Sequence, residues 1–141
     1  MKCAVCNHEL VINSICKPGD NEFDCPNCGK YSISTSVLES NTVFKENKYL
    51  LAGYLFNRDN KENILEDIST SNISDLINKT YRLTPLEKID KLLIYIYEET
   101  DFFGEEVPVQ LANYPISYAV NDQEFNFIIQ KAQELKYIES K

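Results

Sequence analysis

The chain has 141 residues, 43% of them hydrophobic and 11% aromatic, with a formal net charge of −8. This length suits one ordinary domain, or a small metal module joined to a modest helical one, and the composition excludes a disordered or low-complexity chain. Residues 1–30 hold three Lys against four acidic residues, and residues 31–141 hold eleven Lys or Arg against eighteen. Both parts are acidic, which argues against DNA binding as the default function, because phosphate neutralisation supplies most nonspecific affinity for nucleic acid.

Four cysteines near the N-terminus form two CxxC pairs, Cys3 with Cys6 and Cys25 with Cys28. Each pair lets two thiolates converge from one tight turn, and two facing turns complete a tetrahedral shell around zinc. We therefore predict one structural Zn²⁺, because a catalytic zinc keeps an open position that four thiolates do not leave. His8 and Cys16 are alternative ligands, but the two matched pairs already complete the shell.

Residues 1–34 have the pattern of a zinc ribbon. In the second knuckle, Pro26 fixes φ after the first ligand, and Gly29 supplies the left-handed or open backbone needed just past the second. Asn7 stands at the equivalent position of the first knuckle, and Asn is the next most tolerant residue of positive φ. Short strands are expected at residues 10–12, 22–23 and 31–33, with a turn at residues 17–20 between the first two.

Helices are expected to dominate after the ribbon. Ser36 and Glu39 match a capping box, which indicates a short helix. Residues 45–58 are apolar nearly all round and predict a helix that is buried on more than one side. Residues 62–80 carry short apolar groups among Ser, Asn and Asp, and they predict one or two short helices joined by loops.

The clearest helix start in the chain lies at residue 84. Thr84 can cap the helix, Pro85 occupies the first helical position, and Glu87 closes a capping box. An apolar stripe at helical spacing then continues to about residue 99.

The rest of the chain adds a second capped helix. Residues 107–109 favour a short edge strand, where Pro is tolerated, and residues 137–138 favour the beginning of another. Between them, Asn121 caps an amphipathic helix over residues 122–136. This order of helix, strand, helix and strand is that of a winged-helix domain, although the chain stops where the wing hairpin would be built.

The predicted fold class is α+β, mostly helical, with two domains. A zinc ribbon over residues 1–34 packs on a helical domain over residues 35–141. The C-terminal part of the helical domain, about residues 84–141, is winged-helix-like. A plain helical domain with no winged-helix ancestry is the alternative.

Two further groups of residues could carry chemistry or contacts. One is an acidic run made of Glu98, Glu99, Asp101, Glu105 and Glu106. It lies at a helix end and a Gly turn with no accompanying His, so a solvated face is favoured over a second metal site or a general acid. The other group comprises aromatic residues outside the helical stripes, which are candidates for an exposed contact surface: Tyr31, Tyr81, Phe102 and Phe103.

The sequence contains no GxGxxG, P-loop, GxSxG or HExxH motif, and His8 is its only histidine. We therefore expect no enzymatic activity. The N-terminus lacks an apolar signal region, and no apolar run approaches the roughly 18 to 20 residues of a transmembrane helix. These features predict a cytoplasmic protein with reduced thiols and no membrane partner.

Several segments together carry a resemblance to known proteins. They are the two knuckles with His8-Glu9 and Tyr31-x-Ile33-Ser34, the leucine-rich stretch 48–56, residues 87–93, residues 117–125 and residues 135–138. The chain resembles the N-terminal zinc-ribbon and helical module of bacterial multidomain proteins that continue into a TIR-like or other nucleotide-binding effector domain, some of them linked to antiphage defence. The resemblance spans nearly the whole chain, but only the knuckles are specific. It therefore carries over only the four cysteines, and no catalytic residue of an effector domain.

Three functions follow as hypotheses. The first is a zinc-stabilised recognition or adaptor module that contacts a protein partner, as part of an antiphage-defence system. The second is a nucleic-acid-binding transcriptional regulator that uses the ribbon or helix 122–136, on which Gln123, Asn126, Gln130 and Lys131 could reach base edges. The third is a sensor that binds a small ligand between the ribbon and the helices.

Overall fold

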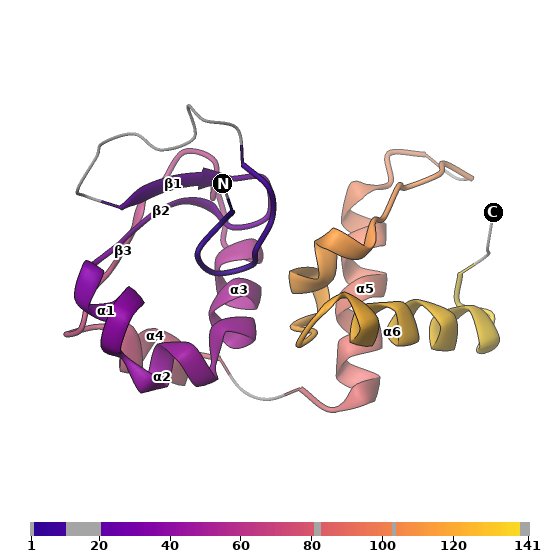
Figure 1. The fold of residues 1–141 in the computed structure, drawn as a ribbon. Coiled ribbons are helices and arrows are strands. Elements are labelled where there is room, and N and C mark those ends of the chain that lie inside the picture. Colours follow the sequence, from indigo (N-terminus) through magenta and orange to yellow (C-terminus); the bar gives the residue numbers. More distant parts are fainter. Residues whose placement is uncertain (1, 11–20, 81–82, 103, 139–141) are drawn as a thin grey trace. The chain divides into compact units, whose positions relative to one another are not determined.

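The computed structural model describes residues 2–10, 21–80, 83–102 and 104–138. These residues form seven helices and one three-stranded sheet, which confirms a mixed class in which about half of the residues are helical. The chain divides into two compact units, Met1–Tyr81 and Arg82–Lys141 (Figure 1). Within the described residues, no helix combines the length and the apolar character needed to cross a membrane.

The first unit contains the sheet and four of these helices. Its strands are β1 (Glu22–Cys25), β2 (Gly29–Ile33) and β3 (Glu66–Ile68), and its helices are α1 (Thr35–Ser40), α2 (Thr42–Glu46), α3 (Lys48–Phe56) and α4 (Ile73–Asn78). β1 and β2 form an antiparallel hairpin at two of the predicted strand positions. The predicted strand at residues 10–12 and the turn at residues 17–20 lie almost entirely outside the described residues.

β3 was not predicted, and it changes the division of the chain. It pairs in parallel with β2, with Tyr31 opposite Glu66 and Ile33 opposite Ile68. A parallel pair needs a crossover connection, and α1, α2 and α3 supply it. Strands from the ribbon (β1 and β2) and a strand that follows the helices (β3) therefore belong to one sheet. The compact units divide between residues 81 and 82 and not at the predicted boundary after residue 34.

The helices of the first unit begin at different residues from those predicted. α1 is capped by Ser34, whose hydroxyl accepts a hydrogen bond from the backbone N–H of Val37, so the predicted cap at Ser36 is wrong by two residues. The single helix expected over residues 45–58 is two helices, because Asn47 leaves helical backbone at φ −126° between them. Burial of α3 on more than one side is confirmed, since five of its nine residues are buried.

The second unit consists of α5 (Pro85–Glu99), the 3-10 helix η2 (Leu111–Ser117) and α6 (Asp122–Glu134). The capping box at Thr84 is confirmed in full, and Asn121 caps α6 as predicted. α6 ends at Glu134, two residues earlier than expected, and Lys136 then adopts a left-handed φ of 63°. The core of this unit contains Leu92, Ile116, Phe125 and Ala132, all at most 1% exposed.

An ion pair joins α5 to α6. The Lys88 ammonium lies 2.8 and 2.9 Å from the two carboxylate oxygens of Glu124, and the Lys88 side chain is only 12% exposed. Glu124 also accepts a hydrogen bond from the backbone N–H of Val120, at 2.8 Å.

In the described residues, neither 107–109 nor 137–138 forms a paired strand, so both strand predictions are wrong. This unit is a packed set of helices in which no wing is seen among the described residues.

Candidate metal centre

The first knuckle is a tight loop that brings Cys3 and Cys6 together. The backbone N–H of Asn7 donates to the carbonyl oxygen of Cys3 at 3.0 Å, and the N–H of Cys3 donates to His8 at 2.9 Å. Asn7 adopts φ 63°, as its place after the second ligand predicted. An Asn tolerates this left-handed conformation better than most residues. The loop therefore holds its two sulfurs on one side without a glycine.

The second knuckle is the turn between β1 and β2. β1 ends at Cys25 and β2 begins at Gly29, and these two residues are opposite each other in the ladder. Gly29 has φ 74°, which confirms the predicted left-handed backbone. A second constraint acts at the same position, because a Cβ added to Gly29 would overlap the carbonyl group of Lys61. Lys61 also accepts a hydrogen bond from the N–H of Lys30 at 2.8 Å, so the chain 32 residues further on lies directly against this turn.

The two knuckles bring the four predicted sulfurs into one cluster. All four Sγ atoms lie within 4.8 Å of one another, and the Cys3–Cys28 and Cys6–Cys25 pairs are 3.8 and 3.5 Å apart. A tetrahedral shell with metal–sulfur bonds of about 2.3 Å has sulfur–sulfur edges of about 3.8 Å. The four side chains are between 0% and 3% exposed. The cluster can hold one metal ion with four thiolate ligands, and it leaves no ligand position facing solvent.

The electrostatics of the cluster favour a cation. The pKa of the Cys3 thiol is lowered chiefly by a hydrogen bond from Cys25, and that of Cys25 is lowered chiefly by a hydrogen bond from Cys28. The same contacts raise the pKa values of Cys6 and Cys28, each chiefly through its hydrogen bond with Cys25. The pKa values of neighbouring sulfurs are therefore shifted in opposite directions, because negative charges this close together repel one another. A bound metal ion removes this conflict, because thiolates ligate it in the deprotonated form.

Tyr31 is part of this centre and not of a contact surface. Its side chain is completely buried, which contradicts the prediction that it is exposed. Its hydroxyl oxygen lies 2.9 Å from Cys3 Sγ and accepts the N–H of Ala4 at 3.2 Å. Burial raises the pKa of Tyr31, so the hydroxyl keeps a proton that it can donate to a Cys3 thiolate. The ring stacks on Phe23 with 5.1 Å between centroids, which fixes the direction of the hydroxyl.

Asn27, between the two ligands of the second knuckle, also supports the sulfurs. Its side-chain N–H₂ group lies 3.7 Å from Cys6 Sγ, and the side chain is only 1% exposed. The Lys61 ammonium donates to the Asn27 carbonyl oxygen at 2.9 Å. A buried amide that points at a thiolate stabilises its negative charge and orients it, as outer partners of metal ligands do.

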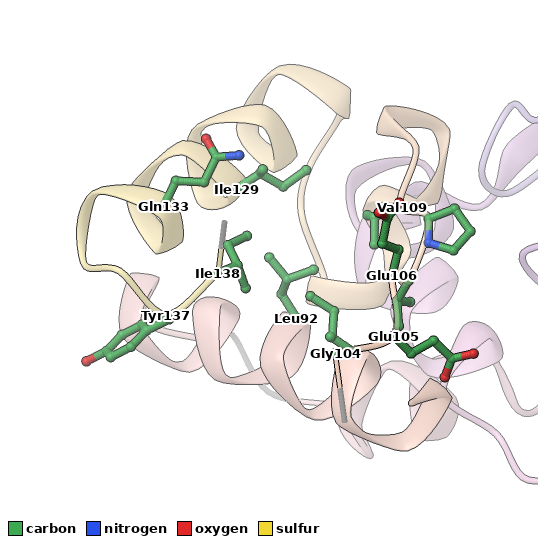
Figure 2. A pocket seen from close by; sticks show the side chains of 12 residues that line it. Leu92, Gly104, Glu105, Glu106, Val109, Ile129, Gln133, Tyr137 and Ile138 are labelled. Atoms are coloured by element: carbon green, nitrogen blue, oxygen red, sulfur yellow. The ribbon is translucent and has the colours of Figure 1, made fainter. Parts of the chain in front are cut away.

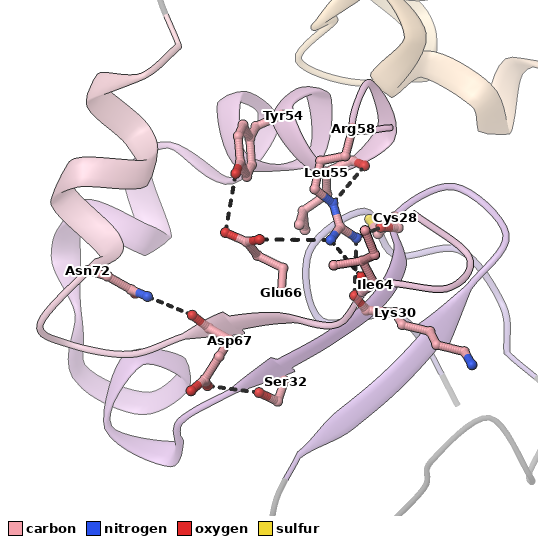
Figure 3. Close-up of polar contacts among 10 residues, drawn as sticks. All are labelled: Cys28, Lys30, Ser32, Tyr54, Leu55, Arg58, Ile64, Glu66, Asp67 and Asn72. Carbon is pink, nitrogen blue, oxygen red and sulfur yellow. Dashed lines mark hydrogen bonds and ion pairs between the residues drawn. The ribbon is translucent and has the colours of Figure 1, made fainter. Parts of the chain in front are cut away.

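Arg58, just past the end of α3, connects the second knuckle to the rest of the first unit (Figure 3). Its guanidinium donates to the carbonyl oxygens of Cys28 at 2.8 Å, Lys30 at 3.1 Å and Ile64 at 3.0 Å. Glu66 on β3 lies 3.9 Å away and accepts a hydrogen bond from Tyr54 on α3. The planar guanidinium of Arg58 therefore links the end of α3, the second knuckle and the edge of the sheet through its polar contacts. Nothing in the local sequence around residue 58 indicates this role.

His8 and Phe102, two of the remaining predicted site residues, do not join the cluster. His8 is half-buried, and its Nδ1 lies 2.8 Å from the carbonyl oxygen of Glu9. Cys16, Tyr81 and Phe103 lie outside the described residues. Phe102 is 64% exposed, as expected for a contact residue.

The acidic run does not form a second metal site in the structure. Four of its five side chains are exposed, and Glu105, which is half-buried, accepts a hydrogen bond from the backbone N–H of Asp101 at 2.6 Å. Among the described residues, the four cysteines are the only group of potential ligands close enough to share a metal ion. No family model, curated protein or solved structure matches the chain.

Proposed function

We propose that this chain is a protein-recognition module whose N-terminal unit is stabilised by one structural zinc ion. The observation that carries the proposal is the closed shell of Cys3, Cys6, Cys25 and Cys28, all nearly inaccessible to solvent. Four thiolates in tetrahedral arrangement suit zinc, and such a site contributes folding free energy without an open position for a reacting molecule. The centre would therefore act as a cross-link between the two knuckles, with recognition carried by other surfaces and no catalysis in this chain.

The distribution of exposed apolar side chains supports recognition of a protein. Nine such side chains lie in the second unit: Leu86, Ile94, Tyr97, Phe102, Leu111, Val120, Phe127, Leu135 and Tyr137. Only Ile64 and Leu65 are comparable in the described residues of the first unit. Exposed aromatic and aliphatic groups are typical of protein interfaces when they gather on one unit. The acidic balance favours a partner with basic groups.

Nucleic-acid binding is a second candidate function, supported by one feature of α6. Gln123, Asn126 and Gln130 are all exposed on this helix, and their amides could pair with base edges. Residues 82–141 nevertheless hold six Lys or Arg against eleven acidic residues. The same helix carries Lys131, but this cation is paired with Glu134 at 3.4 Å.

The proposal also includes a role in antiphage defence, which rests on a resemblance alone. Its support is the resemblance of the knuckles and four further segments to the N-terminal modules of bacterial defence proteins. The proposed location is the cytoplasm, where thiols stay reduced and available to zinc. On this basis the partner would be an effector protein of a bacterial cell.

Two measurements on the zinc-loaded protein test these functions. The first titrates duplex DNA, single-stranded DNA and RNA at low and near-physiological salt, where the recognition proposal expects no binding. Binding tighter than about 1 μM that weakens steeply with salt would instead support the nucleic-acid function. The second is chemical cross-linking in cells that naturally make the protein, with wild type compared with Phe127→Ser. We expect a cross-linked protein that the variant loses and the matched control Ile64→Ser keeps.

A further inference from the structure

An open groove of about 820 Å³ runs across the second unit (Figure 2). Leu92 and Ile96 of α5 and Ile129 of α6 supply apolar side chains to it, and residues 104–109 form one wall. Figure 2 shows Leu92, Ile129 and Ile138 turned toward the same space. The groove belongs to one unit only, so its shape does not depend on the other.

The wall of the groove has the burial pattern of an extended segment that is not part of the sheet. Burial alternates along it residue by residue: Glu105, Val107 and Val109 are half-buried, whereas Glu106, Pro108 and Gln110 are exposed. Alternation with a period of two is the mark of an extended strand that rests on one face. Within the described residues, the backbone N–H and C=O groups of Val107 and Val109 make no hydrogen bond.

Both ends of this wall are held in place. The N–H of Glu105 donates to the Phe102 carbonyl oxygen at 3.2 Å, and the N–H of Gln110 donates to the Asn113 side chain at 3.0 Å. The segment between them is therefore held at both ends. This lowers the conformational entropy that the segment loses when it pairs with another strand.

The position of Pro108 makes the two edges of this segment unequal. In an extended chain, alternate residues direct their N–H and C=O groups to the same edge. Val107 and Val109 thus share one edge with two donors and two acceptors. The opposite edge carries Pro108, which has no N–H to donate. Only the edge of the two valines can support a continuous ladder.

The charge around the groove indicates what would pair there. Glu105 and Glu106 are the charged residues among those that line it, and none of the lining residues is Lys or Arg. Glu98, Glu99 and Asp101 come shortly before this wall in the chain and are exposed. A strand with basic residues beside its apolar ones would complement this rim.

We propose that this groove binds an extended peptide segment of a partner protein, in which apolar residues alternate with Lys or Arg. The peptide pairs with the edge of Val107 and Val109, and its apolar side chains enter the groove toward Ile96 and Ile129. This is recognition by strand addition, in which main-chain hydrogen bonds give affinity and alternate side chains give specificity. The inference rests on the protein-recognition function proposed above and gives that function a site and a partner chemistry.

The test uses a synthetic peptide of alternating Val and Lys with capped ends, titrated against the zinc-loaded full chain by fluorescence anisotropy. Two forms of the peptide carry N-methyl groups on alternate amides, one form for each edge. We expect one methylated form to bind about tenfold more weakly, since two lost hydrogen bonds of about 0.5–1.5 kcal/mol each amount to roughly that ratio. The other form should keep its affinity. Equal affinities of the two forms, or no binding of the parent peptide, would overturn the proposal.

Variants of the protein locate the site. Val109→Pro removes one donor of the pairing edge and should weaken binding by about threefold, and Glu106→Lys should weaken it while the matched control Glu134→Lys does not. Amide NMR shifts of α5 and α6 establish that each variant is folded. A dimer that Val109→Pro dissociates would show a second copy in the groove and would overturn the assignment to a basic partner. If the cellular cross-link is kept in Val109→Pro and lost in Phe127→Ser, the protein-recognition function is supported but the proposed groove site is wrong. If the wild-type protein gives no cross-link, the protein-recognition function itself is wrong.

Discussion

The hydroxyl oxygen of Tyr31 lies 2.9 Å from the sulfur of Cys3 in a space that solvent does not reach. Tyr31 also accepts the N–H of Ala4, and its own proton stays available for donation to a Cys3 thiolate. One hydroxyl thus joins the middle of β2 to the first knuckle, 28 residues earlier in the chain. The metal centre and the sheet are coupled through this contact.

Replacing Tyr31 by Phe tests that coupling. The substitution keeps the ring and its stacking on Phe23 but removes the proton donated to Cys3. Loss of such an outer partner lowers metal affinity by about 10- to 100-fold. The measurement is competition for zinc against a chromophoric chelator. Tyr54→Phe is the matched control, because its hydroxyl bonds Glu66 and no ligand. Equal zinc affinities in the two variants would show that the Tyr31 hydroxyl does not support the site.

Removal of the metal should affect the two units differently. The four ligands all belong to the unit Met1–Tyr81, so chelation should unfold the ribbon and leave the core around Leu92 and Phe125 folded. Hydrogen exchange measured with and without chelator distinguishes the two cores. We expect lost protection in β1 and β2, unchanged protection in α5 and α6, and the same pattern in Cys28→Ser without chelator. A ribbon that stays protected in zinc-free protein would refute the structural role of the metal.

Gly29 should be far less replaceable than Asn7, although both residues have positive φ. An alanine in the left-handed region costs about 1–2 kcal/mol at either position. At Gly29 the new Cβ also overlaps the carbonyl group of Lys61, so the backbone must move. We expect Gly29→Ala to destabilise the zinc-loaded protein by at least about 1 kcal/mol more than Asn7→Ala. Denaturant unfolding followed by tyrosine fluorescence gives both values. Similar losses of stability in the two variants would mean that the backbone at Lys61 can move away from the new Cβ at little cost.

Arg58 should not be replaceable by lysine. Its guanidinium donates to four backbone carbonyl groups in different directions, and a single ammonium cannot reproduce that fork. The side chain is 9% exposed, so unpaired carbonyl oxygens would remain in a partly buried place. We expect Arg58→Lys to lower the free energy of unfolding by about 2–3 kcal/mol. Lys48→Met, which removes a half-buried cation from the start of α3, should cost much less. Full stability of Arg58→Lys would show that these contacts are dispensable.

The metal ligands could be predicted from the sequence because their chemistry is local. Each CxxC knuckle closes within a few residues, and the positive φ of Asn7 and Gly29 follows from the geometry of that turn. The capped starts at Thr84 and Asn121 are local for the same reason, since cap and partner are three residues apart. Patterns of this range are visible in a single sequence.

The elements that were missed depend on long-range pairing. β3 has two acidic residues among its three, and only its place beside β2 makes it a strand. Tyr31 was predicted to be exposed because it lies outside the helical stripes. It alternates with Ile33 on β2, however, and that spacing points both side chains inward. The role of Arg58 could not be predicted from its neighbours in the sequence, because the groups that it contacts lie on the second knuckle and at the edge of the sheet.

The buried hydroxyl of Ser117 gives the last prediction, in the second unit. It is completely buried, and its Oγ atom is the one buried side-chain nitrogen or oxygen without a hydrogen-bond partner in the described part of the chain. Burying an unpaired hydroxyl costs about 1–3 kcal/mol, so Ser117→Ala should leave stability unchanged or raise it by about 1 kcal/mol. Thermal unfolding of the second unit measures this change. Ser36→Ala, at an exposed position of the first unit, is the control and should not move that transition. A clear destabilisation by Ser117→Ala would reveal that the hydroxyl has a partner in solution, such as a buried water molecule.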